Sequence, residues 1–277
     1  QGLPPTVAAI EKSLREQGIA YEIIIVDDGS NPPIEQTNAS GNVCWFRHEM
    51  NRGYGASLKT GIRRTHSETI LIIDSDGTYP AEKAGELFQR YRSSGVDMLI
   101  GTRQGADARI PLARRPAKWL LNRFAALLVG QPVPDLNSGM RIFRKDLFRR
   151  YETLFPSGFS FTSTLTMASL ADGFQVLFEP IEYRGRIGSS SIRPIRDTYN
   201  FFLLVLTSTL YFNPLRILLP VAIVLFLLAT ATLFFTKYVL GQIADITVTV
   251  LYMLAFQVGL LGFIADVIVR RSRSSPR

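Results

Sequence analysis

The sequence predicts an α/β domain followed by two membrane-spanning helices. Three observations support this fold class: short apolar runs alternate with helical patterns over residues 1–200, carboxylates follow two of those runs directly, and two long apolar segments lie near the C-terminus. Alternation of strands and helices is typical of an α/β domain with a largely parallel sheet. The positive mean hydropathy of +0.14 agrees with apolar residues that gather in one region.

The composition of the 277 residues excludes two classes of protein. A hydrophobic share of 47% can bury enough apolar surface to exclude an intrinsically disordered chain. Cys44 is the single cysteine, which excludes a disulfide scaffold. The net charge of +8 is compatible with nucleic-acid binding, but the basic residues follow the predicted membrane boundary, so we expect no nucleic-acid partner.

The sequence pattern in the first part of the domain predicts, in order, a helix, two strands, a helix, a strand, a helix and a strand. These elements cover residues 7–17, 22–26, 42–46, 54–65, 69–73, 83–93 and 97–100. The strands are short runs rich in β-branched and other apolar residues, and the helices show apolar residues at helical spacing. A nucleotide-binding α/β domain normally opens with a strand, so either a first strand would precede Gln1 or the sheet starts differently here.

Asp74 and Asp76 follow the strand at 69–73 and flank Ser75. In an extended segment this spacing lets both carboxylates reach one divalent ion and a diphosphate. Mg²⁺ and Mn²⁺ prefer oxygen ligands and are commonly shared between carboxylates and phosphate. Open α/β sheets bind ligands at the carboxyl ends of their strands. The sequence therefore predicts a Mg²⁺ or Mn²⁺ site at Asp74 and Asp76.

Residues 74–78 also match the DxDGT nucleophile motif of haloacid-dehalogenase-type phosphatases. Those phosphatases place the motif near the start of their domain and need a downstream GDxxxD motif. Here a strand, a helix and further elements precede the motif, and no GDxxxD follows it, which favours the metal–diphosphate interpretation.

Asp27 and Asp28 close the strand at 22–26, where a carboxylate can accept a hydrogen bond from a nucleobase or a ribose. The alternative there is a plain Asp-Gly turn.

Six short motifs occur in a fixed order along the domain. They are VDDGS at 26–30, NRGYGA at 51–56, DSDGTYP at 74–80, GTR at 101–103, DLNSGMR at 135–141 and RIGSSS at 186–191. This ordered set resembles the family 2 glycosyltransferases with a GT-A fold, above all the polyprenyl-phosphate (dolichyl-phosphate-type) sugar transferases. That family usually opens with a strand that carries a Pro-x-Tyr/Asn-x-Glu motif, which again would precede Gln1.

The resemblance implies an inverting, metal-dependent transfer of a hexose from a nucleotide diphosphate sugar, GDP-mannose or a UDP-sugar, to the phosphate of a membrane polyprenol. A phosphate oxygen is already ionised at neutral pH, so no strong general base is needed. The alternatives are a glycosyltransferase with another lipid or glycan acceptor and a catalytically silent membrane scaffold of the same fold. A processive polysaccharide synthase is disfavoured, because the sequence lacks the Gln-x-x-Arg-Trp motif.

The resemblance also implies roles for individual residues. Donor binding is implied for Asp27, Asp28, Gly53, Asp74, Ser75, Asp76 and Arg103. Catalytic roles are implied for Asp76, Asp135 and Arg141. Contacts with the acceptor phosphate are implied for Ser138, Arg141, Arg186, Ser189 and Arg193, where arginines supply charge-assisted hydrogen bonds. Thr78 and Ser191 replace the Gln and Lys of many relatives, so their roles stay open.

Two segments are predicted to lie at the lipid interface. Residues 111–128 combine basic and apolar side chains as an amphipathic helix does, and Arg114 and Arg115 would there contact the polyprenyl phosphate. The alternative is a surface helix packed on the sheet. Residues 193–213 predict a second interfacial helix, and residues 159–171 a helix rich in Ser and Thr.

Residues 215–236 and 246–269 are long and apolar enough to cross a bilayer. The alternative is a pair of buried helices in a soluble core. Basic residues precede the first segment and fill 270–277, whereas the intervening loop offers Lys237 alone. The positive-inside rule therefore predicts a plasma (inner) membrane protein with both termini and the catalytic domain in the cytoplasm, and we expect no signal peptide.

The predicted organisation is a catalytic domain at 1–192, an interfacial helix at 193–213, a transmembrane hairpin at 214–269 and a basic tail at 270–277. The expected partners are the nucleotide sugar, the polyprenyl phosphate and the bilayer. A homo-oligomer is compatible with the sequence, which does not set the oligomeric state.

Overall fold

The computed structural model describes residues 2–35, 41–104, 126, 130, 132–156, 158, 161–184, 202–203, 206–207, 209–211, 213–242 and 244–274. The chain divides into two compact units. One holds residues 1–126 and 131–204, and the other holds 127–130 and 205–277. The interfacial helix predicted at 111–128 lies outside the described residues apart from Ala126, as does much of the helix predicted at 193–213.

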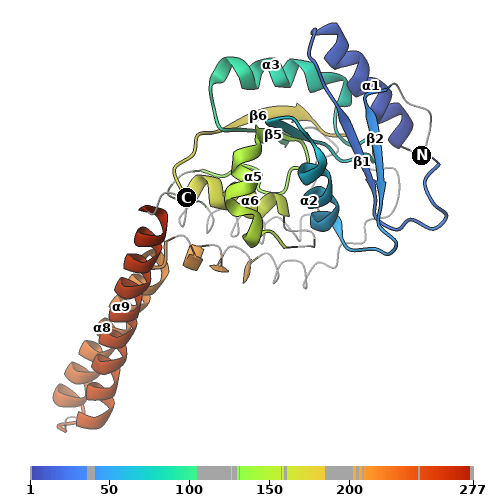
Figure 1. The fold of residues 1–277 in the computed structure, drawn as a ribbon. Coiled ribbons are helices and arrows are strands. Elements are labelled where there is room, and N and C mark those ends of the chain that lie inside the picture. Colours follow the sequence, from blue (N-terminus) through green and yellow to red (C-terminus); the bar gives the residue numbers. More distant parts are fainter. Residues whose placement is uncertain are drawn as a thin grey trace. The chain divides into compact units, whose positions relative to one another are not determined.

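The first unit alternates helices and strands, as predicted (Figure 1). Its elements are α1 (Leu3–Glu16), β1 (Ile23–Asp27), β2 (Val43–Arg47), α2 (Tyr54–Arg64), β3 (Thr69–Ile72), η1 (Ala81–Lys83), α3 (Ala84–Ser94), β4 (Met98–Gln104), β5 (Arg141–Arg144), α5 (Lys145–Tyr151), η4 (Glu152–Leu154), α6 (Phe161–Ala171) and β6 (Val176–Glu182). In Figure 1, α1 and α3 lie on one face of the strands, and α5 and α6 lie on the other.

The described strands form two sheets. β1 and β2 pair in parallel, and the second sheet has the order β3-β5-β4-β6. In that sheet β5 runs antiparallel to both of its neighbours, whereas β4 and β6 are parallel. The sheet is therefore mixed, and the expectation of a largely parallel sheet missed the reversed central strand.

This topology brings three segments to one edge of the sheet. β3, β4 and β6 share a direction, so their carboxyl ends lie together, and the oppositely directed β5 begins there. The register shows this directly, because Arg141 at the start of β5 pairs with Ile72 near the end of β3 and with Ile100 in β4. The chain that leaves β3 and the chain that enters β5 therefore meet.

Close helix packing stabilises this framework. Ile10 and Leu14 of α1 pack with Ala81, the first residue of η1, and with Ala84, the first residue of α3. A second apolar cluster joins α3 to the sheet and contains Tyr79, Leu87, Tyr91, Leu99, Met140, Ile142 and Ile181. Buried side chains of this size each stabilise the fold by about 1.5–3 kcal/mol relative to exposure.

The second unit contains a helical hairpin. Its helices are α8 (Leu215–Tyr238) and α9 (Asp245–Ser274), and both are long and apolar enough to cross a membrane. Gly262 of α9 lies so close to α8 that an added Cβ would be 2.9 Å from Cβ of Leu218. In the most apolar window of each helix, 11% and 17% of residues are buried, which disfavours the alternative of two soluble-core helices. The hairpin supports membrane association.

Helix α9 extends into the predicted basic tail. The helix continues to Ser274, so Arg270 and Arg271 are helical. Arg270 donates a hydrogen bond of 2.6 Å from Nε to the Asp266 carboxylate one turn earlier. Pairs four residues apart on a helix stabilise it, which accounts for the extension.

Candidate functional site

The two carboxylates after β3 stand at the shared edge of the sheet. Asp74 and Asp76 follow β3 with Ser75 between them, and Gly77 then turns the chain with a φ of +77°. The Asp76 carboxylate accepts hydrogen bonds from the backbone N–H of Thr78, at 3.1 Å, and from its hydroxyl, at 2.6 Å. Thr78 is fully buried. The residue that departs from many relatives therefore orients the Asp76 carboxylate.

Asp74 is enclosed by two neighbours. The hydroxyl of Tyr54, the first residue of α2, donates a hydrogen bond of 3.0 Å to Asp74 Oδ1. On the chain entering β5, Gly139 lies so close that an added Cβ would overlap the Asp74 carboxylate. Burial raises the pKa of Asp74, and the negative charge of Asp76 raises it further. A bound cation would offset both effects.

Arg103, near the end of β4, forms an ion pair with Asp135. Its Nε and one terminal nitrogen each donate to the Asp135 carboxylate at 2.7 Å. Burial would lower the pKa of Arg103, but the Asp135 carboxylate raises it above its usual value, so the guanidinium stays charged. The guanidinium carbon lies 5.6 Å from the centre of the Tyr183 ring. Paired geometry of this kind fixes the direction of an arginine.

Arg141 differs from its predicted role as a phosphate contact. Its side chain is fully buried, and it donates to the carbonyls of Leu136, Ser138 and Thr162 and to the Thr166 hydroxyl. These bonds use all five N–H groups of the guanidinium. Burial lowers the pKa of Arg141 to about 10. In this arrangement Arg141 joins the 135–140 loop to α6 and presents no N–H to a phosphate.

Ser138 and Tyr79 stabilise the same loop. The fully buried Ser138 donates its hydroxyl to the carbonyl of Gly101 in β4. The Tyr79 hydroxyl accepts a hydrogen bond of 2.6 Å from the backbone N–H of Gly139, and burial raises the pKa of Tyr79 to about 12. Ser138, predicted as an acceptor contact, is therefore engaged within the protein.

The carboxylates after β1 have different surroundings. Asp28 Oδ1 accepts from the backbone N–H of Arg52 at 2.9 Å and bonds His48 Nδ1 at 2.7 Å, and Oδ2 accepts from Gly53 N–H at 2.7 Å. Burial would raise the pKa of Asp28, but these donors lower it below its usual value. Asp28 thus anchors the turn that begins α2, and Gly53 occupies that turn with a φ of +96°.

Asp27 keeps one carboxylate oxygen without a hydrogen-bond donor among the described residues, which makes it a candidate for nucleoside binding. Its Oδ1 accepts from the backbone N–H of Ser30 at 2.9 Å, and hydrogen bonds from Ser30 lower its pKa. Its buried Oδ2 lies 3.5 Å from Arg47 Nε and has no hydrogen-bond donor among the described residues.

The structure brings Asp74, Asp76, Arg103, Asp135, Ser138 and Arg141 to one edge of the sheet. Five predicted acceptor contacts lie outside the described residues, so their contacts remain predictions: Arg114, Arg115, Arg186, Ser189 and Arg193.

The sequence did not predict Tyr54, Tyr79 and His48 as site residues. Tyr54 directly follows Gly53 of the Gly-rich turn, and this position is a signal that could have identified it. Within the described ranges no three His, Cys, Asp or Glu side chains form a metal cluster. Asp74 and Asp76 therefore suit an ion that takes its other ligands from a substrate or water.

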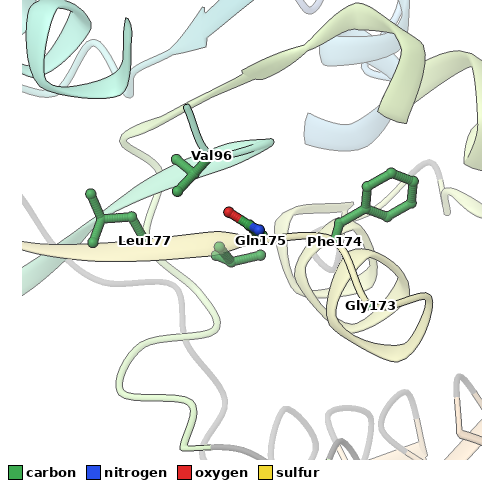
Figure 2. Close-up of a pocket in the computed structure, with 6 residues that line it drawn as sticks. Val96, Gly173, Phe174, Gln175 and Leu177 are labelled. Carbon is green, nitrogen blue, oxygen red and sulfur yellow. The ribbon is translucent and has the colours of Figure 1, made fainter. Parts of the chain in front are cut away.

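A surface pocket elsewhere in the domain does not coincide with these residues. Figure 2 shows its lining, which is Val96, Gly173, Phe174, Gln175, Val176 and Leu177. Val96 precedes β4 and residues 173–177 lead into β6, so the pocket lies at the amino ends of these strands. It has no ionisable side chain, which makes it unsuitable for phosphate chemistry.

Known proteins resemble this chain over the domain that holds the site. The profile of glycosyl transferase family 2 matches residues 4–152. A dolichyl-phosphate hexose transferase of Haloferax volcanii is 28% identical over 177 residues, which are 62% of this chain and 74% of that protein. The low-salt glycan biosynthesis hexosyltransferase Agl6 of the same organism is 24% identical over 200 residues, 71% of this chain. The chain spans 48% of the length of Agl6.

Solved structures support the fold. The glucosyl-3-phosphoglycerate synthase from Mycobacterium tuberculosis, crystallised with Mn²⁺, UDP and phosphoglyceric acid, superposes with a TM-score of 0.50. The match covers 74% of each chain at 15% sequence identity. At this identity the likeness shows the GT-A fold and no more.

Proposed function

The chain belongs to glycosyl transferase family 2, and on this premise we propose that it transfers a hexose from a nucleotide diphosphate sugar to the phosphate of a membrane polyprenol, with inversion. One observation carries the proposal. The paired carboxylates Asp74 and Asp76 stand at the ligand-binding edge of the sheet with the Arg103–Asp135 ion pair, in a chain that also carries a membrane-type hairpin.

Asp74 and Asp76 are the residues that would hold a divalent ion, Mg²⁺ or Mn²⁺. Their oxygens are the ligands that these ions prefer, and a bound cation would offset the burial that raises the pKa of Asp74. The ion would stabilise the charge that develops on the leaving diphosphate. The Mn²⁺ and UDP bound by the mycobacterial synthase are consistent with this assignment.

The reaction joins two anions. An oxygen of the acceptor phosphate forms a bond to the anomeric carbon of the sugar, while the bond from that carbon to the diphosphate oxygen breaks and the nucleoside diphosphate leaves with the electron pair. Asp135 takes Nε and one terminal nitrogen of Arg103, and the other terminal nitrogen has no partner among the described residues. That nitrogen is suited to a phosphate oxygen, and Asp135 acts by aiming the arginine.

Donor recognition is proposed for the end of β1, where Asp27 has a buried oxygen without a hydrogen-bond donor among the described residues and Asp28 anchors the turn that holds Gly53. Ser75 is proposed to contact the diphosphate of the donor.

The acceptor is a lipid, so the hairpin of α8 and α9 would hold the enzyme at the bilayer that contains it. Both termini and the catalytic domain are proposed to be cytoplasmic, at the plasma (inner) membrane. The predicted acceptor contacts at Arg114, Arg115, Arg186, Ser189 and Arg193 belong to this proposal.

A donor panel tests the proposal. The purified chain in liposomes receives radiolabelled GDP-mannose, UDP-glucose or another UDP-sugar, with Mn²⁺ and either a short polyprenyl phosphate or the unphosphorylated polyprenol. We expect one donor to give a labelled lipid with the phosphate acceptor alone. NMR of the product should show an inverted anomeric centre. Absence of lipid product with every donor, or equal transfer to the unphosphorylated polyprenol, would overturn the proposal.

A further inference from the structure

We propose that Tyr54 is a positioning residue that sets the orientation of the Asp74 carboxylate for the divalent ion. The inference rests on the proposed metal role of Asp74 and Asp76. Its first support is direct contact, because the Tyr54 hydroxyl donates a hydrogen bond of 3.0 Å to Asp74 Oδ1. A neutral donor can orient a carboxylate without cancelling the charge that a cation needs.

The second support is the close approach of Gly139. An added Cβ there would overlap the Asp74 carboxylate, so the loop leading to β5 limits the space that this carboxylate can occupy. The backbone N–H of Gly139 is itself held by the Tyr79 hydroxyl at 2.6 Å. Asp74 is therefore constrained both by a hydrogen bond from α2 and by the chain that enters β5.

The third support is the fixed position of Tyr54 itself. The residue before it, Gly53, donates its N–H to Asp28 Oδ2 at 2.7 Å. The residue after it, Gly55, donates its N–H to the carbonyl of Gly158 at 3.1 Å. Both backbone neighbours of Tyr54 are therefore anchored to other segments, so its backbone is held by the fold independently of the bond to Asp74.

These contacts connect the two carboxylate motifs of the sequence. Asp28, at the end of β1, anchors the turn that begins α2, and Tyr54 extends from that helix to Asp74, at the end of β3. Residues that orient metal ligands contribute about tenfold to a hundredfold to metal affinity. We infer that Tyr54 contributes to the affinity for the ion by holding Asp74 in a binding orientation before the ion arrives.

The test measures Mn²⁺ binding by electron paramagnetic resonance on the purified chain in nanodiscs, with GDP or UDP present. Tyr54→Phe keeps the ring and removes the hydroxyl. Tyr91→Phe is the matched control, because Tyr91 is also a buried tyrosine but packs in α3, near Arg144 and Asp97. Asp74→Asn tests the metal role on which the inference rests.

We expect Tyr54→Phe to weaken Mn²⁺ binding by about tenfold, whereas Tyr91→Phe binds as the wild type does. In turnover assays Tyr54→Phe should raise the KM for Mn²⁺ and recover the wild-type kcat when Mn²⁺ saturates. A purely structural role would lower kcat at every Mn²⁺ concentration, and that result would overturn the inference. Unchanged Mn²⁺ binding in Tyr54→Phe, with binding lost in Asp74→Asn, would overturn the inference alone. Unchanged binding in Asp74→Asn would overturn the proposed metal role as well.

Discussion

The carboxylates at the ends of β1 and β3 have opposite surroundings. Asp28 accepts hydrogen bonds from two backbone N–H groups and bonds a histidine ring, and its pKa is lowered. Asp74 accepts a hydrogen bond from the Tyr54 hydroxyl, and its pKa is raised by burial. The surroundings therefore stabilise the charge of Asp28 more than that of Asp74, which agrees with the metal role proposed for Asp74.

The difference fits an anchoring role for Asp28 and the proposed metal-binding role for Asp74. Both residues follow strands, and both belong to short Asp-rich motifs, so their sequence context is alike. Their donors differ because the turn before α2 folds back over the end of β1, whereas the end of β3 faces Gly139 and a tyrosine hydroxyl. Buried, poorly satisfied carboxylates mark sites of function more often than well-satisfied ones do.

Removal of divalent ions should have the largest effect. If Asp74 and Asp76 hold an ion that stabilises the leaving diphosphate by several kcal/mol, chelation should lower turnover by about a thousandfold. Added Mn²⁺ or Mg²⁺ should restore it. The measurement is the rate of lipid-phosphate sugar formation before and after treatment with EDTA. A rate that EDTA leaves unchanged would contradict a metal role for the carboxylates after β3 and with it their proposed difference from those after β1.

Replacement of Arg141 tests whether this buried cation neutralises the site or supports the loop. Arg141→Met would remove the guanidinium that donates to the carbonyls of Leu136, Ser138 and Thr162, of which Thr162 keeps the hydroxyl of Thr166 as a donor. We expect the free energy of unfolding to fall by about 3 kcal/mol, because each buried unsatisfied group costs about 1–3 kcal/mol. Thermal unfolding in detergent measures it. Unchanged stability with weakened phosphate binding would instead support the role predicted from the sequence.

The anchoring role of Asp28 predicts a pH dependence. Its folded pKa is lowered, so the stability that it contributes is complete above its unfolded pKa of about 3.9 and is lost as the pH falls towards the folded value. Asp28→Asn should lower the free energy of unfolding at pH 7 by about 1.5 kcal/mol. Unfolding midpoints of both proteins between pH 3 and pH 7 should converge at the acid end. A constant difference across this range would contradict the anchoring role.

Thr78→Val should give the smallest effect. Valine keeps the volume of the fully buried Thr78 but removes the hydroxyl that donates to Asp76, while the backbone N–H bond remains. A net loss of about 1 kcal/mol corresponds to roughly fivefold weaker Mn²⁺ binding. Calorimetric titration with Mn²⁺ and nucleotide measures it, and equal affinity in both proteins would show that the hydroxyl does not orient Asp76.

Much of the fold could be predicted from local pattern, and the exceptions have physical causes. β1 and β3 are short runs rich in β-branched residues, a pattern that a sequence reveals. β5 has four residues, begins with Arg141 and pairs with strands distant in the sequence, so its short pattern gives little signal. β6 contains Pro180 and lies at an end of the described sheet, the position where proline is tolerated in a strand.

The site was predictable in place but less so in role. Strand ends predicted where Asp74 and Asp76 lie, because ligands gather at that edge of an α/β sheet. The roles of Asp28 and Arg141 depend on which donors and acceptors the fold brings to them, and these come from residues such as Gly53 and Thr162. A motif gives residue types, whereas the partners that engage them are set by tertiary structure.

Sugar transfer to a lipid phosphate is proposed to depend on the carboxylates after β3. The most direct measurement compares wild type with Asp76→Asn in liposomes that contain polyprenyl phosphate, Mn²⁺ and the donor that the wild type uses. We predict that the wild type forms labelled lipid-phosphate sugar and that Asp76→Asn forms at least about a hundredfold less, because it loses a charged metal ligand. Equal product from both proteins would contradict the account.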